Sequence, residues 1–181
     1  DYPVVVTDGT GTMVRYNRVT DDTTFTAPAS ITGTKAAGSE PINGEIHIWV
    51  DAGITETYAE AFARTGFASF PSKWKLVKAG PGVLDKSTGV GTGQQCTWIT
   101  EGVLVTLNNN DFGNPSFGDN DIKIIPGATL RFSTQYDHRF NNRICNFAGT
   151  GAPGEGGAIH CQRGRSFTTY GQFKLDGDAT I

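Results

Sequence analysis

The chain has few charged side chains, no long hydrophobic run and no excess of positive charge. Asp, Glu, Lys and Arg make up 18% of its 181 residues, below the roughly 25% of an average soluble domain. The formal net charge is −3, so the overall charge does not favour nucleic acid or an anionic membrane as a partner. No stretch approaches the roughly 20 apolar residues of a membrane-spanning helix. We therefore expect no nucleic-acid partner and no membrane insertion.

Several catalytic and targeting signatures are also missing. The sequence has no G-x-S-x-G elbow, no P-loop and no dinucleotide-binding glycine motif after a strand. It has no signal peptide, and its start at Asp1 fits either a processed mature end or a trimmed chain. We expect no cofactor, no catalytic residue and no enzymatic activity.

Small polar residues are abundant, with 24 Gly and many Thr, Asn and Ser. This composition, with its low charge, is typical of extracellular all-β proteins. The length suits a single domain over residues 1–181 and can bury a substantial core.

Alternating apolar and polar residues recur along the whole chain and predict many short strands. Turn residues separate them, as in "AGPG", "IPGA" and "APGEGG". This spacing predicts an antiparallel β-sandwich or jelly-roll-like fold, and no internal repeat is evident. The expected strands cover residues 3–7, 12–19, 23–27, 45–51, 73–79, 95–107, 121–125, 128–136, 143–147, 158–163 and 166–175.

One connection is predicted to be helical, over "ETYAEAFART" at residues 56–65. Thr55 is the expected N-terminal cap and Gly66 the expected stop. Glu56 and Arg64 suit the helix dipole. The Gly- and Thr-rich region 80–94 reads as a mobile loop.

The three cysteines cannot all pair within the chain. Cys145 and Cys161 are equally far from Pro153 in the loop between them, so a hairpin centred there would place them opposite one another. We expect a Cys145–Cys161 disulfide, with Cys96 as a buried thiol. Three reduced thiols are the alternative.

The strand "EIHIWVD" separates two kinds of side chain. Ile46, Ile48 and Val50 are expected on the core side, and Glu45, His47, Trp49 and Asp51 on the other. An indole on the polar side offers a flat face against which a sugar can stack, so Trp49 is a candidate ligand-binding residue. The alternative is that Trp49 packs beneath a loop.

The loop "NNNDFGNPSFGDND", residues 108–121, carries five Asn and three Asp. Amide and carboxylate groups bind vicinal hydroxyls well, so we expect ligand contacts from Asn110, Asp111, Asn114 and Asp119. Phe112 and Phe117 are candidate apolar contacts in the same loop. A calcium site is a rival interpretation, although the spacing does not match an EF-hand. A solvated turn-rich loop is another.

Two further groups of residues have binding chemistry. Arg143 and Arg163, with Arg139 and Arg165, would come together in the expected hairpin and could recognise an anion; the alternative is a solvated strand edge. His47, His138 and His160 are the only histidines and could together hold zinc. No compact spacing supports such a metal site, so we expect none.

The chain resembles the receptor-binding domain of bacterial chaperone–usher pilus tip adhesins. The resemblance rests on the opening "YPVVVTDGTGT", the length, the many short strands and the closing "RSFTTYGQFKLDGDATI". It implies an elongated β-sandwich at the pilus tip that binds a host glycan or glycoprotein through end loops, with a pilin domain following the C-terminus. The odd cysteine departs from this plan.

The resulting prediction is a secreted or cell-surface, monomeric, non-catalytic adhesin. Two alternatives stay open. One is a secreted carbohydrate-active enzyme that uses Glu45 with Glu101 or Asp137, because glycosidases use paired carboxylates. The other is a metal-dependent or protein-binding adhesion module, such as a phage fibre tip.

Overall fold

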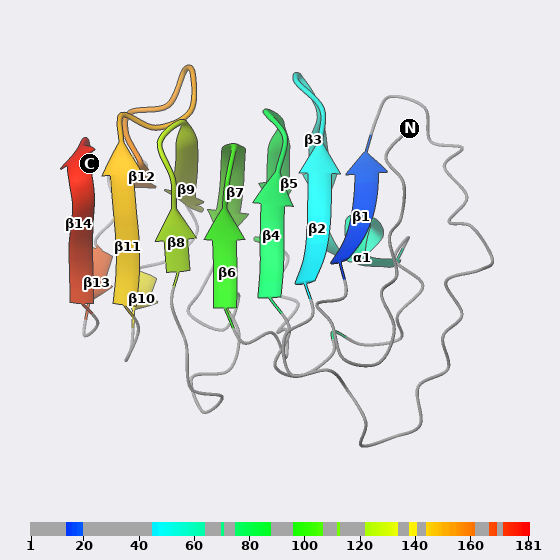
Figure 1. The fold of residues 1–181 in the computed structure, drawn as a ribbon, viewed down its shortest axis with the longest axis horizontal. Helices are drawn as coiled ribbons and strands as arrows, with labels where there is room; N and C mark the ends of the chain where they lie inside the picture. The colour runs from blue at the N-terminus through cyan, green and yellow to red at the C-terminus, as the bar shows by residue number, and fades with distance from the viewer. Residues whose placement is uncertain are drawn as a thin grey trace.

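The computed structural model describes residues 14–19, 45–63, 70, 75–87, 96–106, 112, 122–133, 138–140, 144–161, 167–169 and 172–181. Strands dominate the described residues, with one short helix (Figure 1). The elements are β1 (Val14–Val19), β2 (Glu45–Val50), β3 (Thr55–Thr57), α1 (Tyr58–Ala63), β4 (Lys75–Ala79), β5 (Val83–Asp85), β6 (Cys96–Ile99), β7 (Gly102–Thr106), β8 (Ile122–Ile124), β9 (Ala128–Phe132), β10 (His138–Phe140), β11 (Ile144–Gly149), β12 (Ile159–Cys161), β13 (Phe167–Thr169) and β14 (Gln172–Ala179).

Every strand pairing among these elements is parallel. Sheet A has seven strands in the order β1-β2-β4-β6-β8-β11-β14, and sheet B has five in the order β12-β9-β7-β5-β3. Sheet C is the pair β10-β13. From β2 onward, the chain thus passes from a strand of sheet A to one of sheet B and then returns to the next strand of sheet A. Strands β10 and β13 of sheet C lie on two of these returns. This winding is a β-solenoid-like stack, with sheet A in front and sheet B behind in Figure 1.

The prediction of an antiparallel β-sandwich or jelly roll was therefore wrong. The turn residues that were interpreted as hairpin turns are instead corners between two sheets. "AGPG" joins β4 to β5, and "IPGA" joins β8 to β9. The expected strand over 95–107 is likewise split at such a corner into β6 and β7. Two strands joined by a corner contribute to different sheets, so they do not pair with each other.

The solenoid also contains a repeat that was not evident in the sequence. The strands of sheet A from β2 onward begin at residues 45, 75, 96, 122, 144 and 172. One coil therefore recurs about every 20–30 residues, a period typical of solenoids. Within each of three successive coils, a strand of sheet A, a glycine-containing corner and a strand of sheet B follow directly: residues 75–85, 96–106 and 122–132.

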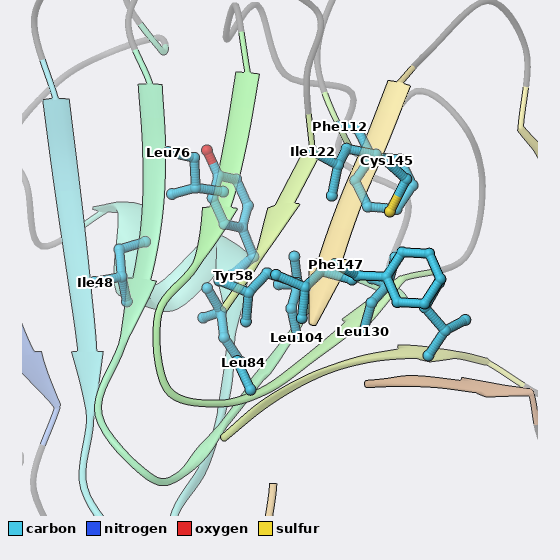
Figure 2. Close-up of a cluster of buried hydrophobic side chains, with 14 of the residues drawn as sticks. Ile48, Tyr58, Leu76, Leu84, Leu104, Phe112, Ile122, Leu130, Cys145 and Phe147 are labelled. Atoms are coloured by element: carbon cyan, nitrogen blue, oxygen red, sulfur yellow. The ribbon is translucent and has the colours of Figure 1, made fainter. Parts of the chain in front are cut away.

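The core lies between sheets A and B and is built by columns of aligned side chains (Figure 2). In sheet A, the register places Ile48, Lys78, Ile99, Ile124, Phe147 and Leu175 in one inward-facing column. In sheet B, a facing column contains Glu56, Leu84, Leu104, Leu130 and Ile159. The expected core side of residues 45–51 is confirmed, since Ile46, Ile48 and Val50 are fully buried.

The predicted helix exists but is shorter than expected. It spans Tyr58–Ala63, and its cap is Thr57 rather than Thr55. The Thr57 hydroxyl accepts a hydrogen bond from the Glu60 amide at 3.3 Å and donates one to the Glu60 carboxylate at 2.6 Å. Glu56, expected in the first turn, belongs to β3 and is mostly buried in the inward column. Among the described residues, no helix has the length and apolar character needed to cross a membrane.

Candidate functional site

Sheet A presents a polar outer face, here called the Trp98 face: Lys75, Trp98, Lys123, Asn146 and Lys174. Residues in a strand alternate between the two sides of the sheet, so these residues point away from the buried columns. The register aligns Trp98, Lys123, Asn146 and Lys174 in one row across four neighbouring strands. Lys123 and Lys174 are exposed, and the other three are partly exposed.

The Trp98 ring lies between two cationic side chains. The Lys75 ammonium group is 4.1 Å from the ring centroid, and that of Lys123 is 5.7 Å from it. Both distances fall within the range of cation–π attraction. Lys75 comes from β4 and Lys123 from β8, the two strands that flank β6. The indole therefore holds two ammonium groups in place on an accessible surface.

The same face continues toward β2, where His47 aligns with Val77 and Trp98 in the row. His47 is partly exposed, as the alternation predicted. Trp49 is also partly exposed, and its indole N–H donates a hydrogen bond to Asp51 at 2.8 Å. A Cβ added at Gly80 would lie 2.9 Å from the Trp49 ring. Trp49 therefore packs closely against the backbone of the next corner, which limits its use as a stacking platform.

Sheet B has a different outer face, because the segment 150–158 folds over it. The Thr129 hydroxyl donates to the Gly157 carbonyl and accepts from the Ala152 amide, both at 2.8 Å. Ala152 packs with the outward-facing Val103 and Val105 in a small apolar cluster. The outer face of sheet B is thus partly covered by this segment, whereas the Trp98 face is accessible.

A buried carboxylate ties the same segment down. Glu155, 8% exposed at its side chain, makes an ion pair and hydrogen bonds with Arg131, and it lies 2.7 Å from His160 Nδ1. Burial alone would raise the pKa of Glu155, but the hydrogen bonds from Arg131 and His160 outweigh it and hold the pKa below its usual value. The three side chains satisfy one another, so this triad is structural.

Lys78 is a second buried charged group, located at the corner between β4 and β5. Its side chain is fully buried. The ammonium group donates to the carbonyls of Ala79, Gly80 and Glu101 at 2.9, 2.6 and 3.0 Å. Burial lowers the pKa of Lys78 to about 7, and the charge of Glu101 acts in the opposite direction. Its bonds join two successive corners of the solenoid, which gives Lys78 a structural role.

The expected cross-strand disulfide was wrong. Cys145 lies buried in β11 of sheet A, whereas Cys161 is exposed in β12 of sheet B. Each strand pairs with other partners, β11 with β8 and β14 and β12 with β9. Among the residues that the structure describes, Cys145 and Cys161 form no disulfide. Cys96 is a buried thiol, as expected. Although Cys161 is exposed as a residue, partial desolvation of its thiol raises its pKa.

Most of the predicted ligand-binding residues cannot be placed. Asn110, Asp111, Asn114, Asp119, Arg143 and Arg163 lie outside the described residues. Phe112 is described, and it is fully buried in the core rather than available as a ligand contact. Of the predicted ligand-binding residues, Trp49 is the one with a described side chain.

The alternative sites are described only in part. His47 lies on sheet A and His160 on sheet B, whereas His138 belongs to sheet C and its side chain lies outside the described part of the chain. The described part of the chain contains no cluster of His, Cys, Asp and Glu that could hold a metal ion. Glu45 begins β2, whereas Glu101 follows the end of β6. The register pairs Glu45 with Lys75, and Lys75 with Cys96. Glu101 follows Cys96 by five residues, so the backbones of Glu45 and Glu101 are about 16 Å apart along the strand direction. This backbone separation does not favour Glu45 and Glu101 as the paired carboxylates of a glycosidase. Asp137, the other predicted partner of Glu45, lies outside the described residues.

The Trp98 face was missed because its residues are distant in sequence. Lys75, Trp98, Lys123 and Lys174 come from four different coils, and only the parallel register aligns them. The available signal was alternation, which puts Lys75 on the polar side of "KLVKA" and Trp98 on that of "CTWI". Comparisons with protein-family models, curated proteins and solved structures found no match to this chain.

Proposed function

We propose that this chain is an extracellular, non-catalytic binding domain of the adhesin type that holds a glycan against the Trp98 face. The observation that carries the proposal is the placement of Trp98 between the ammonium groups of Lys75 and Lys123 on an accessible sheet. Aromatic rings and charged groups together suit a ligand that has apolar C–H faces and polar or acidic substituents.

The shape of the face also supports a chain-like ligand. The Trp98 face spans five neighbouring strands of sheet A, from β4 to β14, and four of its side chains form a row along the solenoid. Solenoids commonly use such extended surfaces for binding. Affinity at a shallow, solvated surface would be modest, about micromolar to millimolar, and multiple copies on a cell surface would raise it through avidity. Attachment to a pilus stays a prediction, and the proposal does not depend on it.

A glycan array probed with the purified chain tests the proposal, with the variants Trp98→Ala and Trp98→Phe beside the unmodified protein. We expect Trp98→Ala to weaken binding at least about tenfold, about 1.4 kcal/mol, because it removes the ring that positions both lysines. Trp98→Phe keeps an aromatic ring and should retain much of the binding.

Pro153→Ala is the matched control, because Pro153 is exposed on the segment that covers sheet B. It should bind as the unmodified protein does. Absence of any glycan signal from folded protein, or equal binding by Trp98→Ala, would contradict the proposal.

A further inference from the structure

The faces of the Trp98 ring indicate which glycans suit this surface. A neutral sugar stacks its C–H face directly on an aromatic ring. At Trp98, ammonium groups from β4 and β8 already lie over the ring. A neutral sugar would have to displace them, whereas an acidic ligand would bind them where they are. The contacts at Trp98 therefore favour an anionic ligand.

The lysines of the Trp98 face recur on alternate strands. Lys75 lies on β4, Lys123 on β8 and Lys174 on β14, and one strand separates each from the next in sheet A. Neighbouring strands are about 4.8 Å apart, so alternate strands are about 9.5 Å apart. The backbone of Lys75 aligns with Cys96, two residues before Trp98, and so lies outside the row. Its side chain nevertheless extends into the row, where the ammonium group contacts the Trp98 ring. The strands that carry these lysines are thus spaced regularly along the solenoid.

The groups between the lysines are uncharged. Trp98 separates Lys75 from Lys123, and Asn146 separates Lys123 from Lys174 in the register. Strand β14 also carries two acidic residues, Asp176 and Asp178. They follow Leu175 in the part of β14 where the pairing with β11 shifts register, so they are not members of the row. The row therefore alternates between a positive charge and an aromatic or amide side chain.

This spacing discriminates among polyanions. One strand of duplex DNA carries a phosphate every 3.4 Å along the axis, much closer than the lysines. Alternate strands are about 9.5 Å apart, so a polymer whose acid groups are separated by an uncharged sugar fits the lysines better than one with an acid on every unit. A polymer with one acid group per disaccharide would place its acid groups on the lysines, and its uncharged sugars would span the gaps between them, beside Trp98 and Asn146.

We propose that the Trp98 face binds an acidic polysaccharide that carries one carboxylate or sulfate per disaccharide and lies along the solenoid axis. This inference rests on the proposed glycan-binding function and specifies its ligand class. The lysines supply the charge recognition, and the net charge of −3 for the whole chain disfavours indiscriminate binding of other polyanions.

The test compares binding of the whole chain to four immobilised polymers of similar length: hyaluronan, with an acid on alternate sugars; polygalacturonate, with an acid on every sugar; neutral dextran; and double-stranded DNA. We expect hyaluronan to bind most tightly. Its binding should fall at least about tenfold between about 50 mM and about 300 mM salt, because ion pairs at a surface are screened.

The decisive variant is Lys123→Gln/Lys174→Gln, which should weaken hyaluronan binding at least about tenfold. Lys123→Arg/Lys174→Arg should keep binding, because it preserves both charges. The control is Ala52→Glu/Pro153→Glu, which lowers the net charge by as much as Lys123→Gln/Lys174→Gln does. Ala52 and Pro153 are exposed and lie outside the Trp98 face, so this variant should bind hyaluronan nearly as well as the unmodified protein. Lys123 and Lys174 are exposed, so thermal unfolding of the variants should match that of the unmodified protein.

The failure modes are distinguishable. Equal binding of dextran and hyaluronan, unaffected by the Gln pair, would overturn this inference and leave the glycan-binding function intact. Tighter binding of polygalacturonate or DNA than of hyaluronan would overturn it as well. Absence of binding to any glycan, here and on the array, would overturn both proposals.

Discussion

At the scale of single residues, Glu155 decides how firmly segment 150–158 is held against sheet B. Its carboxylate is the shared partner of Arg131 and His160. The Glu155→Gln variant should therefore lose about 1–2 kcal/mol of unfolding free energy at pH 7, a value reduced because Arg131 and His160 are partly solvated. Urea unfolding measures this loss.

The contribution of Glu155 also depends on pH. The folded protein holds the pKa of Glu155 below its unfolded value of about 4.3. Its stabilisation is therefore present above that value and is lost as pH falls through the folded pKa. The gap between the unmodified protein and Glu155→Gln should shrink near pH 3. Asp176→Asn, at an exposed carboxylate, is the control and should leave stability unchanged at both pH values; an undiminished gap in acid would contradict this account.

Lys78 should make the stability of the protein depend on pH in the alkaline range. Burial lowers its folded pKa to about 7, whereas an unfolded lysine titrates near 10.4. Between these values the unfolded chain binds more protons, so stability should rise with pH. Measured from about pH 7 to pH 9, the unfolding free energy should therefore increase by about 2 kcal/mol more in the unmodified protein than in Lys78→Met. Parallel pH profiles for the two proteins would contradict the assignment.

At the scale of elements, the corners between sheets A and B require glycine where one coil stacks on the next. Gly102 has φ +67°, and a Cβ there would lie 2.5 Å from the carbonyl oxygens of Gly80 and Gly82. Gly102→Ala should cost about 2–4 kcal/mol, from backbone strain and from displacement of the neighbouring corner. Gly53 has φ +79° with nothing within 4 Å, so Gly53→Ala should cost only about 1 kcal/mol. If Gly102→Ala and Gly53→Ala had equal midpoints in chemical denaturation, the close stacking of corners at Gly102 would not contribute to stability.

The elements themselves were largely predictable, but their pairing was not. Alternation correctly placed Ile46, Ile48 and Val50 in the core, because period-two patterning depends only on which side of the sheet is buried. The same patterning arises in parallel and antiparallel sheets. A glycine turn between two strands is also ambiguous, because it can close a hairpin or turn a corner into a second sheet. The error in fold class therefore arose at the turns.

The candidate site shows the same limit. Local sequence placed His47 and Trp49 together on one side of β2, and both are partly exposed there. Lys75, Lys123 and Lys174, in contrast, become neighbours of Trp98 or of its row only through the stacking of coils. Detecting the recurrent unit of strand, glycine corner and strand over 75–85, 96–106 and 122–132 would have aligned them. Unequal connections between these units hid the period.

At the scale of the whole molecule, the middle of the solenoid should be more sensitive to substitution than its C-terminal end. Ile124 and Leu175 occupy the same inward column. Ile124 is 2% exposed between two neighbouring strands, whereas Leu175, on the last strand of sheet A, is 66% exposed. Each coil contacts mainly its neighbours, so Leu175 lacks the neighbour that would bury it among the described strands.

Ile124→Ala should therefore cost about 2–5 kcal/mol, because it removes buried atoms and leaves a cavity. Leu175→Ala should cost less than about 1 kcal/mol, since little of its apolar area leaves water on folding. Hydrogen exchange followed by mass spectrometry adds the spatial readout: β14 should exchange faster than β6 and β8, and Leu175→Ala should speed exchange only near β14. Ile124→Ala should speed it on both sides of β8. Similar protection of β14 and β8 in the purified protein would contradict the view that the coil containing β14 is held from one side alone.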